Sequence, residues 1–191
     1  MALCDFVIKA DIEGYDCENP MVRGAESMGI LLNRADINYP VTDGTIDPQN
    51  PFFVSFVNEY ALRCNKKGYR IYQHGKTPWS GTQQEMVEGA NQNTMTNTLQ
   101  FVILKQDVES ADQIFALANG EFVAVLQNKN GTFQVYGYEA GLHCSAAVRE
   151  LYNDDTLSGW LITMTEEGAV KGNIFTDRLS FLDLLSTGTC E

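Results

Sequence analysis

The stretch of sequence that decides the fold is TMTNTLQFVIL, residues 94–104, together with the 34 residues that follow it to position 138. Threonines occupy alternate positions from 94 to 98, whereas Leu99, Phe101 and Ile103 fall on the opposite face of an extended chain. Alternation with period two and an abundance of β-branched residues are typical of a strand. We therefore expect residues 93–104 to form a strand with one polar and one apolar face.

The continuation of this stretch predicts a helix and then a hairpin. Asp107 is a good N-cap, and the Asn119-Gly120 pair supplies a left-handed stop. Between them, four apolar residues at helical spacing predict the packed face: Val108, Ala111, Phe115 and Ala118. The apolar runs 122–127 and 132–138 flank Asn128-Lys129-Asn130-Gly131, a connection ending in Asn-Gly that favours a β-hairpin.

Outward from this centre, the pattern indicates strands separated by turns. Residues 52–62 alternate apolar side chains and predict a strand, with a buried helix as the competing interpretation. Trp160, Ile162 and Met164 share one face of a strand at 160–165, and residues 177–185 predict a helix that packs Leu179, Leu182 and Leu185. Further extended segments are expected at residues 4–10, 27–37, 68–72 and 83–89, and loops at 14–20 and 73–81. Residues 39–51 are either an excursion loop or a short hairpin closed at Asp43-Gly44.

These elements predict a mainly β (α+β) fold: an antiparallel sandwich or barrel with one flanking helix. The length of 191 residues fits a single domain, 1–191, that can bury a sizeable core. We expect it to carry an extended loop at about 38–51 and a C-terminal segment at about 173–191. No run of about 18 apolar residues is available to span a bilayer, and the N-terminus lacks the basic region of a signal peptide.

Charge and cysteine content narrow the function classes. Thirteen Lys and Arg against 25 Asp and Glu give a net charge of −12, which argues against gripping nucleic acid. The charge fits either simple surface solvation or a surface that must not adhere to DNA. Five scattered cysteines without a C-x-x-C motif favour reduced thiols, and a Cys4–Cys17 bridge is the alternative left open by the sequence.

Candidate catalytic groups do not assemble into a motif. His143 and Cys144 are adjacent, and neighbouring strand residues face apart rather than forming a thiolate–imidazole pair. His74 has no second metal ligand nearby, and the adjacent acids Asp154-Asp155 and Glu166-Glu167 are typical of solvated turns. The glycines at 137, 141 and 159 do not match a dinucleotide-binding fingerprint. We therefore expect no enzyme activity, no metal and no cofactor.

The order of these elements resembles virion proteins of the tail tube type encoded by phages that infect Bacteroidetes. The resemblance is carried by four pieces that span most of the chain: residues 4–8 with 14–19 and 29–32; 87–89 leading to 98–104; 117–128 with 135–142; and 154–156 before 159–166.

The resemblance implies a subunit that joins its own copies into a ring, hexameric or higher, through which DNA passes without specific binding. Rings would stack into a tail tube or form a connector, in contact with other phage tail proteins and with no membrane. The protein would be assembled in the host cytoplasm and reside in the virion tail. An acidic lumen would then let DNA slide.

The same resemblance suggests where copies meet. Residues 39–51 are either an arm that reaches the adjacent subunit or an ordinary surface loop, with Thr42, Asp43, Gly44 and Asp47 as candidate contacts. Trp79 is either a further interface residue or a partly buried loop anchor. Two other functions compete with assembly: a β-sandwich module that binds carbohydrate or a host surface through Trp79, Tyr69 and Tyr72, and a small hydrolase built around His74 or His143.

Overall fold

The structure is a computed structural model that describes residues 24–37, 54, 62–73, 78–89, 92–105, 107–149, 159–170 and 174–186. Its strands are β1 (Ala25–Asn33), β2 (Tyr69–Tyr72), β3 (Gln83–Val87), β4 (Thr94–Ile103), β5 (Glu121–Asn128), β6 (Phe133–Tyr136), β7 (Leu142–Arg149), β8 (Trp160–Ala169) and β9 (Ile174–Thr176). Its helices are the short 3-10 helix η1 (Arg34–Asp36), α1 (Val108–Asn119) and α2 (Arg178–Asp183).

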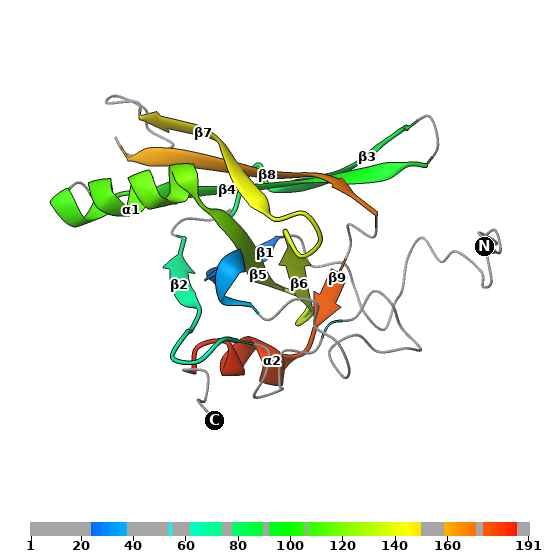
Figure 1. Ribbon diagram of the computed structural model, residues 1–191, viewed down its shortest axis with the longest axis horizontal. Coiled ribbons are helices and arrows are strands. Elements are labelled where there is room, and N and C mark those ends of the chain that lie inside the picture. Colours follow the sequence, from blue (N-terminus) through cyan, green and yellow to red (C-terminus); the bar gives the residue numbers. More distant parts are fainter. Residues whose placement is uncertain are drawn as a thin grey trace.

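The strands form one antiparallel sheet that folds over on itself. The order of its strands is β2-β1-β5-β7-β8-β4-β3. A branch leaves this path at β5, where β6 pairs with β5 and β9 pairs with β6. Strands β5 and β7 pair at two positions, Glu121 with His143 and Phe122 with Leu142, so the sheet bends there into a second layer. Within the described residues the sheet is not closed into a barrel. The expected mainly β fold with a flanking helix is thereby confirmed, in its open form (Figure 1).

The layer formed by β1 and β5 is buried on both faces, which explains its continuous apolar sequence. Ile30 and Val125 point into one hydrophobic cluster, and their neighbours Leu31 and Leu126 point into the other. The first cluster lies against α2, which contributes Phe181 and is followed by the buried Leu184. A strand with two buried faces loses the alternation of a half-exposed strand.

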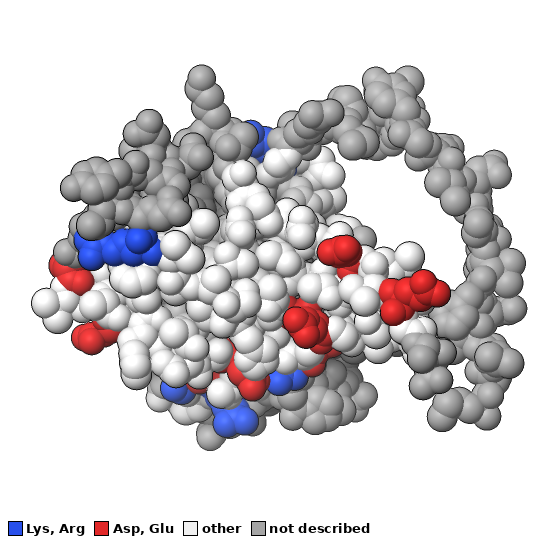
Figure 2. Space-filling view, turned by 90° about the horizontal axis from the view of Figure 1, so that it is seen from above, with Lys and Arg blue, Asp and Glu red and all other residues white. Residues whose placement is uncertain are grey.

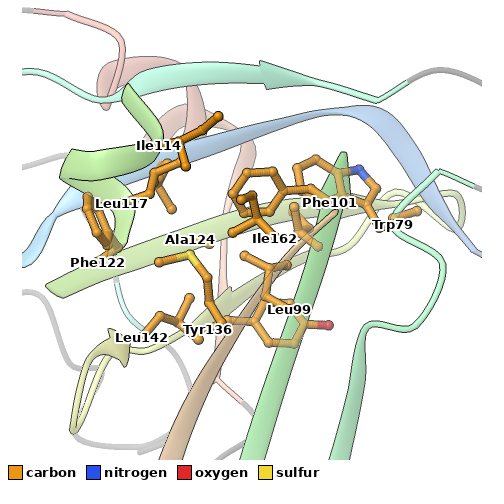
Figure 3. Close-up of a cluster of buried hydrophobic side chains, with 14 residues drawn as sticks. Trp79, Leu99, Phe101, Ile114, Leu117, Phe122, Ala124, Tyr136, Leu142 and Ile162 are labelled. Atoms are coloured by element: carbon orange, nitrogen blue, oxygen red, sulfur yellow. The ribbon is translucent and has the colours of Figure 1, made fainter. Parts of the chain in front are cut away.

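The second cluster lies between the β1–β5 layer and the long strands β4 and β8. Figure 3 shows its labelled side chains converging from β4, β5, β8 and α1. Strands β7, β8, β4 and β3 run along one side of the molecule in Figure 1, with α1 beside one end and α2 on the far side. Because Leu99, Phe101, Ile162 and Met164 on the inner face of β4 and β8 are buried in this cluster, the outer face and the edges of the layer are what it offers to other molecules.

Most predicted elements are confirmed. The strands expected at 27–37, 68–72, 83–89, 93–104 and 160–165 correspond to β1, β2, β3, β4 and β8, and the expected hairpin is β5–β6, with Gly131 at a positive φ of 88°. Helix α1 begins as predicted, because the Asp107 carboxylate accepts a hydrogen bond from the Ser110 amide at 2.9 Å. The segments 4–10, 14–20 and 39–51 lie outside the described residues, as does 52–62 except for Val54 and Leu62.

Both helices turn a different face inward from the one predicted. In α1 the buried residues are Ser110, Ile114 and Leu117, whereas Val108 and Phe115 are 80% and 73% exposed. In α2 Phe181 is buried and Leu179 and Leu182 are exposed, and of the three predicted leucines only Leu185, just after the helix, packs against the first cluster. The left-handed stop after α1 is also wrong, because Gly120 has an extended backbone with φ of −100°.

The expectation of reduced thiols is wrong for one cysteine. Cys64 is disulfide-bonded, and its partner lies outside the described residues. Cys144 is a free thiol. Cys64 lies two residues after Leu62, which forms a β-bridge with Ile37. Leu62 and Ile37 both belong to the first hydrophobic cluster, so the disulfide adds a covalent link close to that cluster.

Candidate assembly interface

Strand β3 forms one end of the sheet. In the described part of the chain it pairs with β4 alone, over the register from Gln83–Thr98 to Val87–Thr94. Its sequence QQEMV contains no proline and no lysine, and Met86 is 66% exposed. Proteins usually protect edge strands with proline or with charged residues such as lysine, because the backbone groups of an edge can pair with another strand. Strand β3 has one charged side chain, Glu85, and neither proline nor lysine, so its protection is slight.

The register shows which residues of β3 direct their backbone groups away from β4. On β4, the amides of Gln100 and Val102 point toward the β3 side, where they donate to Thr82 and Gln73. Because these groups alternate along a strand, Thr94, Thr96 and Thr98 also direct their backbone toward β3. The residues opposite them on β3 are used by the ladder, so Met86 turns its amide and carbonyl groups to the side of β3 away from β4.

Strand β7 forms the opposite edge of the β7-β8-β4-β3 layer. It pairs with β8 along its length, but with β5 only at His143 and Leu142. Beyond that point, no described strand pairs with the other side of Cys144–Arg149, although α1 packs beside β7. No described strand covers this part of β7, and we call its stretch from Ser145 to Val148 the β7 edge.

The two edges have complementary directions. Strands β7 and β8, β8 and β4, and β4 and β3 are each antiparallel, so β3 runs opposite to β7. If β3 of one copy lay beside β7 of the next, the pair would be antiparallel and would continue the alternation of the layer. Such a contact uses two different surfaces, one from each copy.

The outer face of this layer is rich in hydroxyl groups. Register and alternation place the following side chains on it: Thr94, Thr96, Thr98, Gln100 and Val102 of β4, and Leu161, Thr163 and Thr165 of β8. None of them is charged. Figure 2, seen from above, shows a broad area without charged side chains, with acidic side chains on its right and both basic and acidic side chains along its left and lower margins. By register, Glu85 lies opposite Thr96 at the β3 end of this face.

A buried carboxylate holds the layer to the loop between β6 and β7. Glu166 of β8 is only 1% exposed and accepts hydrogen bonds from the backbone amides of Gly137, Glu139 and Ala140 at 2.8, 3.0 and 2.8 Å. The Asn97 side chain donates a fourth bond at 2.7 Å. Gly137 has a φ of +79°, a backbone that favours glycine, so its place in this turn is specific.

The network continues from Asn97 to β3 and β6. The Gln84 side chain donates to the Asn97 oxygen at 2.8 Å, and the Gln134 side chain donates to the Gln84 oxygen at 2.8 Å. This chain of amides ties the open strand β3 to the body of the protein.

The network overturns the prediction that Glu166 and Glu167 are a solvated pair. They lie on a strand, Glu166 inward and Glu167 exposed. The signal was present in the sequence: Trp160, Ile162 and Met164 alternate inward, and continuing the alternation reaches Glu166. A carboxylate at an inward position predicts a hydrogen-bonded network rather than a turn.

Of the candidate catalytic groups weighed and rejected in the sequence analysis, the described residues include the neighbours His143 and Cys144, which the register places on opposite faces of β7. His143 is exposed on β7, and burial raises the pKa of the Cys144 thiol, which disfavours the reactive thiolate. Asp154, Asp155 and His74 lie outside the described residues. Within the described part of the chain, no three His, Cys, Asp or Glu residues gather as a metal site.

Trp79 is a buried loop anchor. It is 5% exposed, packs edge-on against Phe101 and donates its indole N–H to the Glu26 carbonyl at 2.8 Å. Of the two alternatives for Trp79, the structure favours the anchor. The other candidate contacts, Thr42, Asp43, Gly44 and Asp47, lie outside the described residues.

Comparison of the chain with protein-family models, curated proteins and solved structures gives no match. Among the described residues, no helix has the length and apolar character needed to cross a membrane.

Proposed function

We propose that this protein is a structural subunit that joins its own copies head to tail through the β3 and β7 edges. The observation that carries the proposal is the pair of open, antiparallel-compatible edges on opposite sides of one layer. Strand addition satisfies the unpaired N–H and C=O groups of both partners. A contact between two different surfaces repeats, so it closes into a ring or grows into a filament.

The particle that fits this assembly best is a phage tail tube or connector ring through which DNA passes. Adding β3 to β7 extends the β7-β8-β4-β3 layer from copy to copy, so that its outer face becomes one wall of the assembly. The positions that register places on this face from β4 and β8 carry no Lys or Arg, the side chains that bind phosphate. A wall of threonine hydroxyls with Glu85 at its β3 end would let DNA pass without gripping it. Partners would be further copies of this chain and other tail proteins.

The proposal is tested by the mass of the purified protein in solution. Light scattering over a range of protein and salt concentrations should show a discrete species of several subunits or a polymer. Because backbone pairing and apolar contact resist salt, the assembled fraction should persist at high ionic strength. A strict monomer at all concentrations, also in the presence of the other proteins of the same particle, would contradict the proposal.

A carbohydrate-binding module is less well supported. Trp79 is buried, and Tyr69 and Tyr72, although exposed, are three positions apart on β2. Residues three apart on a strand face opposite sides, so the two tyrosines do not form one platform for a sugar.

A further inference from the structure

The free side of β4 is not open along its whole length. Strand β3 covers positions 94–98, and the backbone of β4 continues to Ile103 beyond the end of β3. The amides of Gln100 and Val102 point to this side, and so does the carbonyl of Val102. Left unpaired, these groups would extend the edge that β3 presents.

A single side chain takes the place of a strand at Val102. Gln73 is 6% exposed and follows β2 directly. Its side-chain oxygen accepts from the Val102 amide at 2.8 Å, and its side-chain nitrogen donates to the Val102 carbonyl at 3.1 Å. These are the two bonds that a residue of a neighbouring antiparallel strand would make.

Thr82 covers the backbone of β4 at Gln100, two residues before Val102. Its hydroxyl oxygen accepts from the Gln100 amide at 3.1 Å, and Thr82 immediately precedes β3. Gln73, Thr82 and β3 therefore occupy successive stretches of the same side of β4.

The segment that carries these side chains is fastened to the β1 layer. The backbone amide of Gln73 donates to the Ser27 carbonyl at 2.7 Å, and the Trp79 indole N–H donates to the Glu26 carbonyl at 2.8 Å. Trp79 has a positive φ of 62°, a conformation that costs energy in a non-glycine residue and is kept only where the surroundings fix it. The indole lies against Gly29, where a Cβ atom would approach the ring to 2.7 Å.

We infer that Gln73 and Thr82 form a seal on the edge of β4 that confines strand addition to β3, and so determines where a neighbouring copy joins. The choice of partner, a second copy of this chain, rests on the proposed function; the existence of the seal does not. Without it, an incoming strand could pair with β4 at Gln100 and Val102 and begin a misplaced contact.

The test is Gln73→Leu, which keeps the size of the side chain and removes both bonds to Val102. The matched control is Gln113→Leu on the exposed surface of α1, which makes the same chemical change at a side chain that does not bond to Val102. Amide hydrogen exchange and light scattering are recorded for both variants and for the unaltered protein. If Gln73→Leu does not fold, Thr82→Val with exchange read at Gln100 takes its place.

In Gln73→Leu we expect the Val102 amide to exchange at least about fivefold faster, since one hydrogen bond of typical net strength is lost. We also expect new, larger species: heterogeneous particles if the unaltered protein forms rings, or concentration-dependent oligomers if it is a monomer. The control should show neither change. Unchanged exchange at Val102, or an unchanged mass distribution, would overturn the seal. A monomeric unaltered protein would count against ring assembly alone, because the exchange measurement still decides the seal.

Discussion

Glu166 illustrates how one side chain connects distant parts of the chain. Its two oxygens accept from a turn between β6 and β7 and from Asn97 on the neighbouring strand. An ionised carboxylate makes stronger hydrogen bonds than a neutral acceptor, and here all the donors are fixed by the backbone or by β4. The contribution of Glu166 to folding stability therefore depends both on the charge of its carboxylate and on the positions of its four donors.

Replacing Glu166 by Gln should lower the free energy of unfolding by about 2–4 kcal/mol, because one acceptor oxygen becomes an NH2 group that faces other donors. Glu167→Gln, on the exposed side of the same strand, should change it by less than about 0.5 kcal/mol. Urea unfolding of both variants measures the difference. Equal effects of the two substitutions would show that the network does not stabilise the fold.

Tyr136 predicts a loss of stability in alkali. Burial raises the pKa of the Tyr136 phenol from 10.0 to about 12. Between these values the unfolded chain releases the proton and the folded protein keeps it, so stability is full below pH 10 and falls as the pH rises toward 12. Urea unfolding from about pH 8 to about pH 11 should show a smaller loss for Tyr136→Phe than for the unaltered protein. Parallel curves would contradict the assignment.

At the scale of elements, the sequence predicts strands and helices well and predicts the faces of helices poorly. The alternation in residues 94–103 gives the strand a single apolar face, and in the structure this is the face that is buried. In α1, by contrast, Ile114 and Leu117 compete with Val108 and Phe115 for the inward side. Both pairs have helical spacing, and only the position of β7 and β8 decides between them. Tertiary packing is not encoded in the local pattern.

The two faces of α1 should differ sharply in energy. Ile114→Ala removes buried methyl groups and should cost about 2–4 kcal/mol of unfolding free energy. Phe115→Ser, on the exposed face, should cost less than about 1 kcal/mol in the dissociated subunit. Chemical denaturation at low protein concentration measures both. A larger cost for Phe115→Ser would place the predicted face, not the observed one, against the sheet.

At the scale of the whole molecule, the sequence predicts the class of fold but not the edges of the sheet. Neither β7 nor β9 stands out in the local pattern, and the pairing of β3 with β4 depends on contacts that alternation does not specify. The candidate site is therefore mostly a result of topology. Trp79 was within reach of sequence reasoning as an anchor, whereas Gln73 was not, because a lone glutamine carries no signal of burial.

Met86→Pro should separate folding from assembly. Met86 turns its amide to the open edge of β3, so proline removes a donor that the ladder with β4 does not use. We expect the variant to unfold like the unaltered protein in a dilute solution and to lose most of its assembled mass in light scattering. Met86→Ala, which keeps the amide, should assemble nearly normally. Full assembly of the proline variant would show that copies join elsewhere.

The double burial of the β1–β5 layer has a consequence for how this sequence can diverge. In β4 and β8 every second side chain faces outward, so half of the positions are free of packing constraints while the other half maintain the core. In β1 and β5 no such alternate freedom exists, and at Gly29 even one added methyl group would approach Leu126 to 2.5 Å. The runs GILL at 29–32 and FVAVL at 122–126 should therefore be the slowest-changing parts of the chain among its descendants, and the most useful for tracing distant kinship.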